Sequence, residues 1–478
     1  MKPSLRLASI LQKFIPLIVL FAFYRKDPQS EEFQNIILRI RKTFQTLGPT
    51  YIKLGQMLSS RPDIVGVELA AELRNLLDTQ PAVPFAEIEK ILTDELHIPS
   101  KQVFIRINKK PLATASIGQV HKAVLKNGDV VAIKIQPKGI AKSIFKDLQT
   151  LKKATQLLDF ILGKKGLKFS YAYREFATWI TSELDFKIEG RTIDHFTVSM
   201  AQTEGIIIPQ VYWQYTTSLV LVTTFIEGYT LNQLLKFMRT QRVSTLTQLH
   251  LSFAIDADIL IHRLIHAFVK QLLVDRYFHA DLHPANLIIT PGNNIAFIDF
   301  GISGRLNREE HTQFLYTLLA IVDNDPKAIV KALTSLIISP LNPLQHGLLY
   351  EELASELYKL HSDLGDKSSF SSFIFRVFSL SSRFTISWTP GFILAAKTIT
   401  QIDSITQQIG ITDPMVSLIK PAVEKQMISI FTANISKERM YRTILDIIDS
   451  GKRVPLLLSE LEQMVSLRNA SGKKEVKI

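Results

Sequence analysis

The sequence predicts an α+β fold in which short strands in the middle of the chain are preceded and followed by helices. Three observations support this prediction. Runs rich in β-branched residues are confined to residues 103–136, 210–225 and 287–298. Apolar residues recur at helical spacing on both sides of these runs. No internal repeat is found along the chain.

The composition excludes several classes of function. With 478 residues, of which 46% are hydrophobic, the chain can bury a core in one large domain or in two to three smaller ones. It has no cysteine, which excludes disulfides, thiolate metal sites and a cysteine nucleophile. The formal net charge of +12 favours an anionic partner, such as a nucleotide or acidic lipid headgroups. No interleaved aromatic and arginine run and no zinc-finger spacing is present, so we predict no nucleic-acid binding.

Residues 1–29 form an apolar and basic N-terminal segment. Phe14–Tyr24 is almost wholly apolar and follows Lys2, Arg6 and Lys13. This stretch is too short to span a bilayer. A helix lying in a membrane interface and a helix docked on the protein both fit the pattern equally well.

Residues 30–98 are predicted to form a helical extension. Ser30 is the expected N-cap of its first helix, and Gly48-Pro49 is the expected end. One face of this helix is apolar: Phe33, Ile36, Ile37, Ile40 and Phe44. Similar helical patterns continue to about Leu96.

Residues 99–228 carry the predicted main sheet. Its expected strands are Val103–Ile107, Gln119–Leu125, Val130–Gln136, Gln210–Tyr215 and Leu219–Phe225. The sequence Asn127-Gly128 between two of these runs is a strong hairpin signal. Helical periodicity fills the interval from Ile140 to Met200. Residues 229–466 then read mainly as helices, and residues 467–478 as a disordered polar tail.

The most specific chemical signal is the run Phe278–Asn286 (FHADLHPAN), followed by Asp299-Phe300-Gly301. The pair resembles the catalytic loop and the magnesium-binding triplet of protein kinases. Asp281 would accept a hydroxyl proton or orient the nucleophile, and Asn286 and Asp299 would supply oxygen ligands to Mg²⁺ on the phosphates of ATP. Residues 287–290 and 295–298 read as a small hairpin between the two motifs.

A lysine suited to the α and β phosphates of ATP lies upstream, at Lys134 in the strand sequence VAIK. In the register of a glycine-rich nucleotide loop stand Ala113, Thr114, Ala115 and Ser116, before Gly118. A Cβ at Ala113 and Ala115 restricts positive φ and crowds the phosphates. We therefore expect either altered phosphate placement or restrained turnover.

Two further features complete the expected nucleotide site. Glu183, Asp185 and Glu189 are the candidate acidic partners of Lys134, and Glu189 is preferred. In kinase register, the backbone from Thr224 to Ile226 would contact adenine.

The chain also resembles the UbiB/AarF family of atypical kinases. Lys53-Leu54-Gly55-Gln56 reproduces the KxGQ motif of that family and Glu183-Leu184-Asp185 its ExD element. The alanine-containing loop is a third family mark, and the likeness runs from about residue 40 to 440. Each motif alone is weak, whereas the combination is highly specific.

This resemblance implies an atypical protein-kinase-like, two-lobed fold with a mainly helical C-terminal lobe. The extension carrying Lys53 and Gln56 would cover the active site, with Lys53 meeting Glu183 or Asp185 and leaving Glu189 to Lys134. The family supports the biosynthesis of ubiquinone or related isoprenoid quinones with ATP and Mg²⁺, by ATP hydrolysis or small-molecule phosphorylation. Expected partners are quinone precursors or other quinone-biosynthesis proteins.

The sequence departs from the family pattern at Thr114 and Ser116, and by lacking a closing pair of long apolar segments. The expected location is peripheral, on the cytoplasmic or organelle-matrix side of a membrane, with a cytoplasmic location as the alternative. Two other functions stay open: a nucleotide-binding scaffold that organises quinone enzymes, and a small-molecule phosphotransferase.

Overall fold

The computed structural model describes residues 3–24, 27, 30–76, 82–162, 169–322, 325–338, 342–362, 370–384 and 386–434. Contacts divide the chain into one unit of residues Met1–Val423 and a second of residues Glu424–Ile478. In the second unit the description covers only the end of helix α18 (Met415–Asn434). The predicted tail 467–478 therefore lies outside the described residues.

The chain begins with helices, as the sequence predicts. They are α1 (Pro3–Tyr24), α2 (Glu31–Leu47), α3 (Pro49–Ser59), α4 (Pro62–Val65) and α5 (Val67–Leu73). The predicted cap of α2 is confirmed, because the Ser30 hydroxyl accepts a hydrogen bond from the Phe33 amide at 3.3 Å. The predicted end is confirmed at Gly48, whose φ of 100° suits a residue without a Cβ. All five apolar residues of the predicted face are buried.

Helix α1 docks on the protein through one face. Phe14 packs edge-on against Phe44 at a ring-centroid distance of 5.1 Å, and Phe21 lies 5.4 Å from Phe33. A second face stays exposed at Ile15 (41%), Val19 (61%) and Phe23 (73%). Docking is thus confirmed, whereas lipid contact stays a prediction. None of the described helices is both long enough and apolar enough to cross a bilayer.

The main sheet has the strand order β1-β3-β4-β6, with β2 paired to β3, and all its neighbours are antiparallel. Its strands are β1 (Phe104–Ile107), β2 (Ala113–Thr114), β3 (Gln119–Leu125), β4 (Val130–Ile135) and β6 (Val220–Thr224). The helices α6 (Phe85–Leu96) and α7 (Ser100–Val103) precede it. Ile88 and Ile91 of α6 share a buried cluster with Val131 and Ile133 of β4, so α6 covers one face of the sheet.

The predicted strand Gln210–Tyr215 is wrong as a regular strand. Val211 makes a single bridge to β6, and the segment then turns into the 3₁₀ helix η2 (Trp213–Tyr215). The physical reason is that the Thr216 hydroxyl accepts from the amide of Val222 at 3.2 Å. A side chain thereby replaces the backbone partner that a longer ladder needs.

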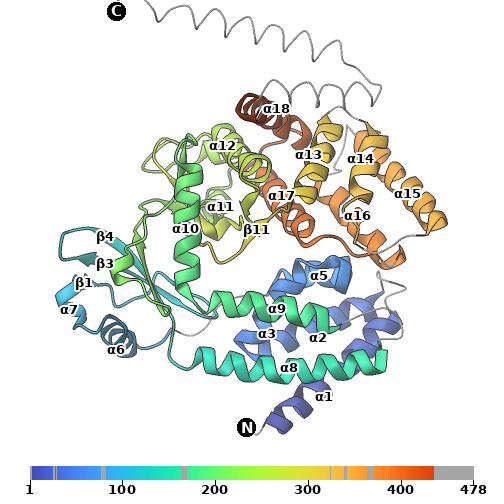
Figure 1. Ribbon diagram of the computed structural model, residues 1–478. Helices are drawn as coiled ribbons and strands as arrows, with labels where there is room; N and C mark the ends of the chain where they lie inside the picture. The colour runs from blue at the N-terminus through green and yellow to red at the C-terminus, as the bar shows by residue number, and fades with distance from the viewer. Residues whose placement is uncertain are drawn as a thin grey trace, which may run out of the picture. The chain divides into compact units, whose positions relative to one another are not determined.

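Three helices follow the hairpin of β3 and β4: α8 (Ile140–Leu162), α9 (Phe169–Glu183) and α10 (Phe186–Met200). Figure 1 shows α8 and α9 running side by side, with the first helices of the chain against them. Leu148 and Phe176 share a buried cluster with Phe33 and Tyr51, so the helical extension packs on these two helices.

The remainder of the first unit is mainly helical. Its helices are α11 (Leu231–Gln241), α12 (Ala257–Lys270), α13 (Arg308–Val322), α14 (Pro326–Thr334), α15 (Pro343–Ser362), α16 (Phe370–Phe384), α17 (Pro390–Gln408) and the first part of α18, with the short turns η3 (Leu246–Gln248), η4 (Gln271–Asp275) and η5 (Pro284–Asn286). Two small sheets lie among them. One contains β5 (Ile206–Ile207), β10 (Asn294–Phe297), β9 (Leu287–Thr290) and β7 (Tyr229–Thr230), and the other pairs β11 (Ser303–Arg305) with β8 (Tyr277–His279).

The predicted hairpin between the two chemical motifs is confirmed as β9 and β10, whose register pairs Leu287 with Phe297. This hairpin, together with the β8–β11 pair, brings the run Phe278–Asn286 next to Asp299. The α+β class is confirmed. The division at residues 30–98, 99–228 and 229–466, and its reading as two lobes, stay predictions.

Candidate active site

Lys134 and Glu189 form the central ion pair of the site. Lys134 lies in β4 between Val120 of β3 and Leu221 of β6. Its ammonium donates to both carboxylate oxygens of Glu189 at 2.8 Å and lies 3.9 Å from Oδ1 of Asp299. The α10 helix therefore supplies the acidic partner, and the motif aspartate lies within reach of the same lysine.

The electrostatics of this group favour a charged lysine. Burial alone would lower the pKa of Lys134, but the charges of Asp299 and Glu189 outweigh burial and raise it. Burial raises the pKa of Glu189, because the effect of burial is larger than the opposing effect of the Lys134 charge, which lowers this pKa. For Asp299 burial also pushes upward, yet the Lys134 charge and the Gly301 amide bring its pKa below the ordinary value. The site thus holds Asp299 ionised beside a permanent cation.

The extension contributes a second ion pair, between Lys53 and Glu183. Lys53 of α3 approaches Oε1 of Glu183 at 3.3 Å, and its ammonium lies 5.7 Å from the Trp179 ring centroid. The expectation left Glu183 and Asp185 open, and the structure places Lys53 against Glu183. Asp185 instead caps α10 by accepting from the Lys187 amide at 3.0 Å.

Glu183 is an acid whose pKa is strongly raised in the site. Burial raises its pKa to about 7, and the nearby Asp299 adds to this effect against the opposing charge of Lys53. Its Oε2 is buried and has no hydrogen-bond partner among the described residues. The ion pair with Lys53 therefore satisfies only one of the two carboxylate oxygens.

The glycine of the KxGQ motif has a steric role. A Cβ at Gly55 would overlap Cδ1 of Leu76 and lie 3.4 Å from the Phe44 ring. Helix α3 can approach α2 and the segment after α5 this closely only because that position has no side chain. Gln56 follows in α3 and is half-buried, one turn after Lys53.

Asp281 is held by three side-chain donors. Its Oδ1 accepts from Lys397 and from Gln401, both at 3.0 Å, and its Oδ2 accepts from the Asn286 amide at 3.1 Å. Burial pushes the pKa of Asp281 upward, but Lys397 and the Gln401 hydrogen bond outweigh burial and lower it. The carboxylate is therefore ionised and fixed in orientation.

His279 connects the two motifs. Its Nδ1 accepts from the amide of Asp281 at 3.2 Å, so its Nε2 carries the proton and donates to the carbonyl of Asp299 at 2.5 Å. Burial lowers the pKa of His279, which keeps the imidazole neutral in this role. One buried side chain thus fixes the spacing of Asp281 and Asp299.

Sequence reasoning missed Lys397 and Gln401. They lie on α17, 116 and 120 residues after Asp281. Their only local signal is an i, i+4 spacing on a helix, which many surface residues share. Gln401 also accepts from the amide of Leu282 at 3.0 Å, so α17 supports the loop backbone as well as the carboxylate.

The alanine-containing loop is docked on the helical extension. Ala113 pairs with Val120, and the Ala115 amide donates to the Gly118 carbonyl at 2.8 Å. Ser116 is buried, and Ile117 belongs to the same hydrophobic cluster as Phe33 and Tyr51. Neither alanine adopts a positive φ. The loop therefore avoids the conformations that its Cβ atoms disfavour.

The strand that would meet adenine uses part of its backbone internally. The Thr224 amide donates to Gln210 at 2.9 Å, and the Phe225 amide donates to Val130 at 3.0 Å. Within the described ranges no group accepts from the Ile226 amide. Among the three backbone amides from Thr224 to Ile226 that were expected near adenine, the Ile226 amide is thus the one that can donate a hydrogen bond to a ligand.

The donor set suits magnesium bound with phosphates. In the described residues no cluster of three His, Asp or Glu could hold a metal by protein ligands alone. Asn286 donates through its amide nitrogen, which leaves its oxygen as an acceptor, and the Asp299 side chain is 47% exposed. Two oxygen ligands supplemented by phosphate and water match the preference of Mg²⁺.

Fold and site together define a protein of the kinase-like class. Residues 75–333 match the model of the ABC1 atypical kinase-like domain. The match covers more than half of the chain, and the chain belongs to this family. The resemblance to the UbiB/AarF atypical kinases is thereby confirmed.

Several relatives of this chain are uncharacterized proteins. One is an uncharacterized protein of Synechocystis sp., 32% identical over 67% of this chain and 78% of the relative. Another is the chloroplastic protein ACTIVITY OF BC1 COMPLEX KINASE 3 of Arabidopsis thaliana, 31% identical over 62% of this chain and 40% of the relative. Several matches span only about half the length of the curated relatives.

A solved structure shares the fold. In the complex of Rv3197 with erythromycin from Mycobacterium tuberculosis, the protein chain has a TM-score of 0.51, with 19% identity, over 71% of this chain and 82% of that chain. At this identity the likeness concerns the fold alone.

Proposed function

We propose that this protein is an ATP- and magnesium-dependent atypical kinase or ATPase that supports the biosynthesis of ubiquinone or another isoprenoid quinone. The observation that carries the proposal is the position of the Lys134 ammonium. It donates to both carboxylate oxygens of Glu189 and lies 3.9 Å from Oδ1 of Asp299. A scaffold without nucleotide chemistry has no evident need for this buried arrangement of charges.

Each residue has a distinct role in the proposed reaction. Lys134 holds the α and β phosphates, and the Ile226 amide binds the adenine edge. Asn286 and Asp299 would hold Mg²⁺, which neutralises phosphate charge when bound. Asp281 orients the attacking hydroxyl or water and accepts its proton, with Lys397 and Gln401 fixing the carboxylate.

The helical extension favours small acceptors over protein substrates. Lys53 reaches the buried Glu183 beside the Lys134 group, and Ile117 anchors the nucleotide loop in the core of the extension. An extended peptide would compete with these contacts for space. Water or a small quinone precursor fits the proposal better.

Peripheral membrane contact belongs to the same proposal. Ile15, Val19 and Phe23 follow one another at i, i+4 spacing on the exposed face of α1. An exposed apolar stripe on a protein of net charge +12 suits a surface of anionic lipid.

The proposed function is tested by ATP turnover of the purified protein with magnesium, with and without anionic liposomes, comparing wild type, Asp281→Asn and Ala115→Gly. Turnover that liposomes stimulate and that Asp281→Asn abolishes is the expected result. Ala115→Gly tests whether the alanine loop restrains turnover, and a rise in rate is expected. ATP binding is measured in parallel, because Asp281→Asn should still bind nucleotide.

Undiminished turnover in Asp281→Asn would overturn the proposal. Binding without turnover in every form, with restoration of quinone levels by Asp281→Asn in cells, would favour the scaffold function instead.

A further inference from the structure

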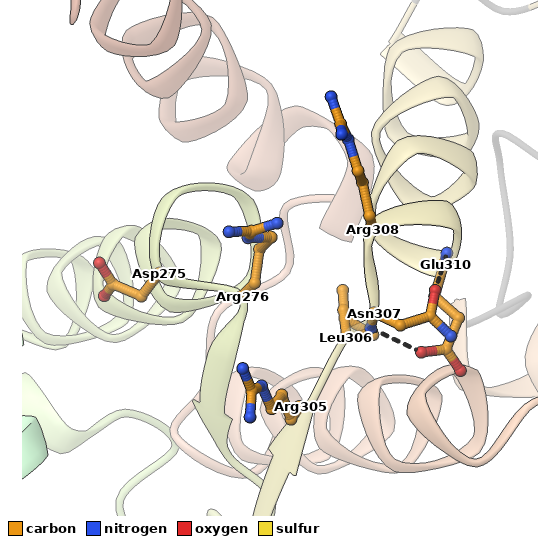
Figure 2. A pocket seen from close by; sticks show the side chains of 7 residues that line it. All are labelled: Asp275, Arg276, Arg305, Leu306, Asn307, Arg308 and Glu310. Carbon is orange, nitrogen blue, oxygen red and sulfur yellow. Dashed lines mark hydrogen bonds between the residues drawn. The ribbon is translucent and has the colours of Figure 1, made fainter. Parts of the chain in front are cut away.

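A basic hollow lies at the start of α13, apart from the nucleotide site. It encloses about 340 Å³ and is shown in Figure 2. Its lining residues are Asp275, Arg276, Arg305, Leu306, Asn307, Arg308 and Glu310. The β8–β11 pair separates it from the catalytic loop, since His279 pairs with Ser303 at one end and Tyr277 with Arg305 at the other.

Three elements each contribute one arginine to this hollow. Arg276 follows η4, Arg305 ends β11 and Arg308 begins α13. All three residues are exposed, and none of their guanidinium groups has a hydrogen bond or ion pair within the part of the chain that the structure describes. Figure 2 shows Arg276 and Arg305 on the strand side of the hollow and Arg308 extending from the first turn of α13.

The two carboxylates of the lining do not neutralise these arginines, because both have other partners. Asp275 accepts from Lys270 at 2.9 Å. Glu310 accepts from the Asn307 amide at 2.8 Å and from the Gly391 amide at 3.2 Å. Asp275 and Glu310 therefore stabilise the lining of the hollow, and the charge that stays unpaired in it is the positive charge of the arginines.

The walls are rigid in backbone as well. The Leu306 amide donates to the Arg276 carbonyl at 2.9 Å, which ties two arginine-bearing segments together. Asn307 Oδ1 accepts from the amides of Glu309 and Glu310, both at 2.9 Å. These helix amides are thus occupied, and an anion would be bound by the guanidinium groups.

We propose that this hollow binds a phosphate-bearing anion, a phosphate monoester or a diphosphate, through Arg276 and Arg305 with Arg308 at the rim. A guanidinium group pairs with two phosphate oxygens at once, and a dianion relieves the mutual repulsion of three neighbouring cations. The site goes beyond the proposed function, because it lies at the Tyr277–Arg305 end of the β8–β11 pair, whereas Asp281 follows the His279 end. Its ligand is either a soluble phosphate compound or the headgroup of a membrane lipid.

The soluble source is tested by calorimetric titration of inorganic pyrophosphate into the full chain. All three proteins compared carry Lys134→Met, which weakens phosphate binding at the nucleotide site, and the first carries this change alone. The second protein adds Arg276→Gln and Arg305→Gln. The matched control adds Arg239→Gln, an exposed arginine on α11 that lies outside the hollow. Thermal unfolding of each variant verifies that it is folded.

The lipid source is tested by sedimentation with phosphatidylcholine vesicles that contain or lack phosphatidic acid. The variant with both Arg276→Gln and Arg305→Gln, here called the arginine pair, is compared with the Arg239→Gln control. The expected result is at least a tenfold loss of affinity in the arginine pair in one of the two assays, with the control unchanged. Loss for pyrophosphate alone assigns a soluble ligand, and loss for phosphatidic acid vesicles assigns a headgroup. Equal affinity of the pair and the control in both assays would overturn the site, whatever the outcome for Asp281→Asn.

Discussion

Asp281 depends on a residue that its own motif does not contain. Lys397 approaches it at 3.0 Å and is the leading influence that holds its pKa below the ordinary value against burial. Two side chains of α17 therefore complete the surroundings of Asp281 in the proposed catalytic loop. A positively charged neighbour at this point keeps the carboxylate ionised and ready to accept a hydrogen bond from a nucleophile.

Replacing Lys397 by Met should lower kcat for ATP turnover by roughly tenfold to a hundredfold, with a smaller effect on KM for ATP. Without the cation the pKa of Asp281 rises, so the acidic limb of the pH–rate profile should move to higher pH. Lys331→Met, on the exposed side of α14, is the control and should leave the profile in place. An unchanged acidic limb in Lys397→Met would show that the lysine does not act through Asp281.

Glu183 gives the site a pH dependence of stability. Its pKa rises from 4.5 to about 7 on folding, mainly through burial. The folded protein therefore holds this proton more tightly than the unfolded chain between these two values. Stability from this group is present at low pH and is lost as the pH rises from 4.5 through 7.

In magnesium-free protein, the free energy of unfolding should thus fall between pH 5 and 8, and Glu183→Gln should remove roughly 1–3 kcal/mol of that fall. Urea unfolding at several pH values in the presence of a chelator measures it. Glu87→Gln, at an exposed position of α6, is the control. A parallel pH dependence in wild type and Glu183→Gln would contradict the assignment.

At the scale of elements, α3 is placed by one missing side chain. Gly55 lets α3 pack against Leu76 and Phe44, and this packing positions Lys53 for Glu183. The motif therefore combines a packing requirement with an ion pair. Neither part is sufficient without the other, because a displaced helix would carry its lysine away from the carboxylate.

Gly55→Ala should destabilise the protein by about 1–3 kcal/mol through overpacking. Gly347→Ala is a matched control, since it lies in α15 with nothing within 4 Å of the new Cβ. That change should be neutral or stabilising by about 0.5–1 kcal/mol, because alanine favours a helix. Thermal and urea unfolding measure both, and equal effects of the two changes would refute the packing role of Gly55.

At the scale of the whole molecule, the exposed face of α1 is the feature that bears on location. One face of the helix is fixed by aromatic contacts with α2, while Val19 and Phe23 are 61% and 73% exposed. Docking thus holds the helix in place and leaves its other face free for lipid.

The double change Val19→Asp and Phe23→Ser should lower binding to anionic vesicles by about a hundredfold or more, because burial of each large apolar side chain contributes ~1.5–3 kcal/mol and each ~1.4 kcal/mol is a factor of ten in affinity. Ile105→Ser removes a similarly exposed apolar residue from β1 and serves as the control. Vesicle sedimentation with folded variants measures the difference. Equal binding of the double variant and wild type would exclude α1 as the membrane contact.

Much of the fold could be predicted from the sequence alone. The capped helix α2, the Asn127-Gly128 hairpin and the hairpin after Asn286 are local structures, set by periodicity and turn chemistry within a few residues. Lys134, Asp281, Asn286 and Asp299 were singled out from short local motifs, and the structure brings Lys134 near Asp299 and Asn286 near Asp281, while their catalytic roles stay predictions. The prediction of a strand at Gln210–Tyr215 was wrong, because the Thr216 side chain accepts a backbone hydrogen bond from β6 and thereby ends the pairing of this segment with β6.

Only the tertiary structure decided which distant residues meet. It chose Glu183 over Asp185 for Lys53, brought Lys397 to Asp281, and gathered Arg276, Arg305 and Arg308 around one hollow (Figure 2). The residues of each of these contacts are separated by tens of positions or more, or lie on different elements. Sequence spacing sets the neighbours within a helix or a hairpin, whereas contacts between elements depend on how buried faces pack in three dimensions.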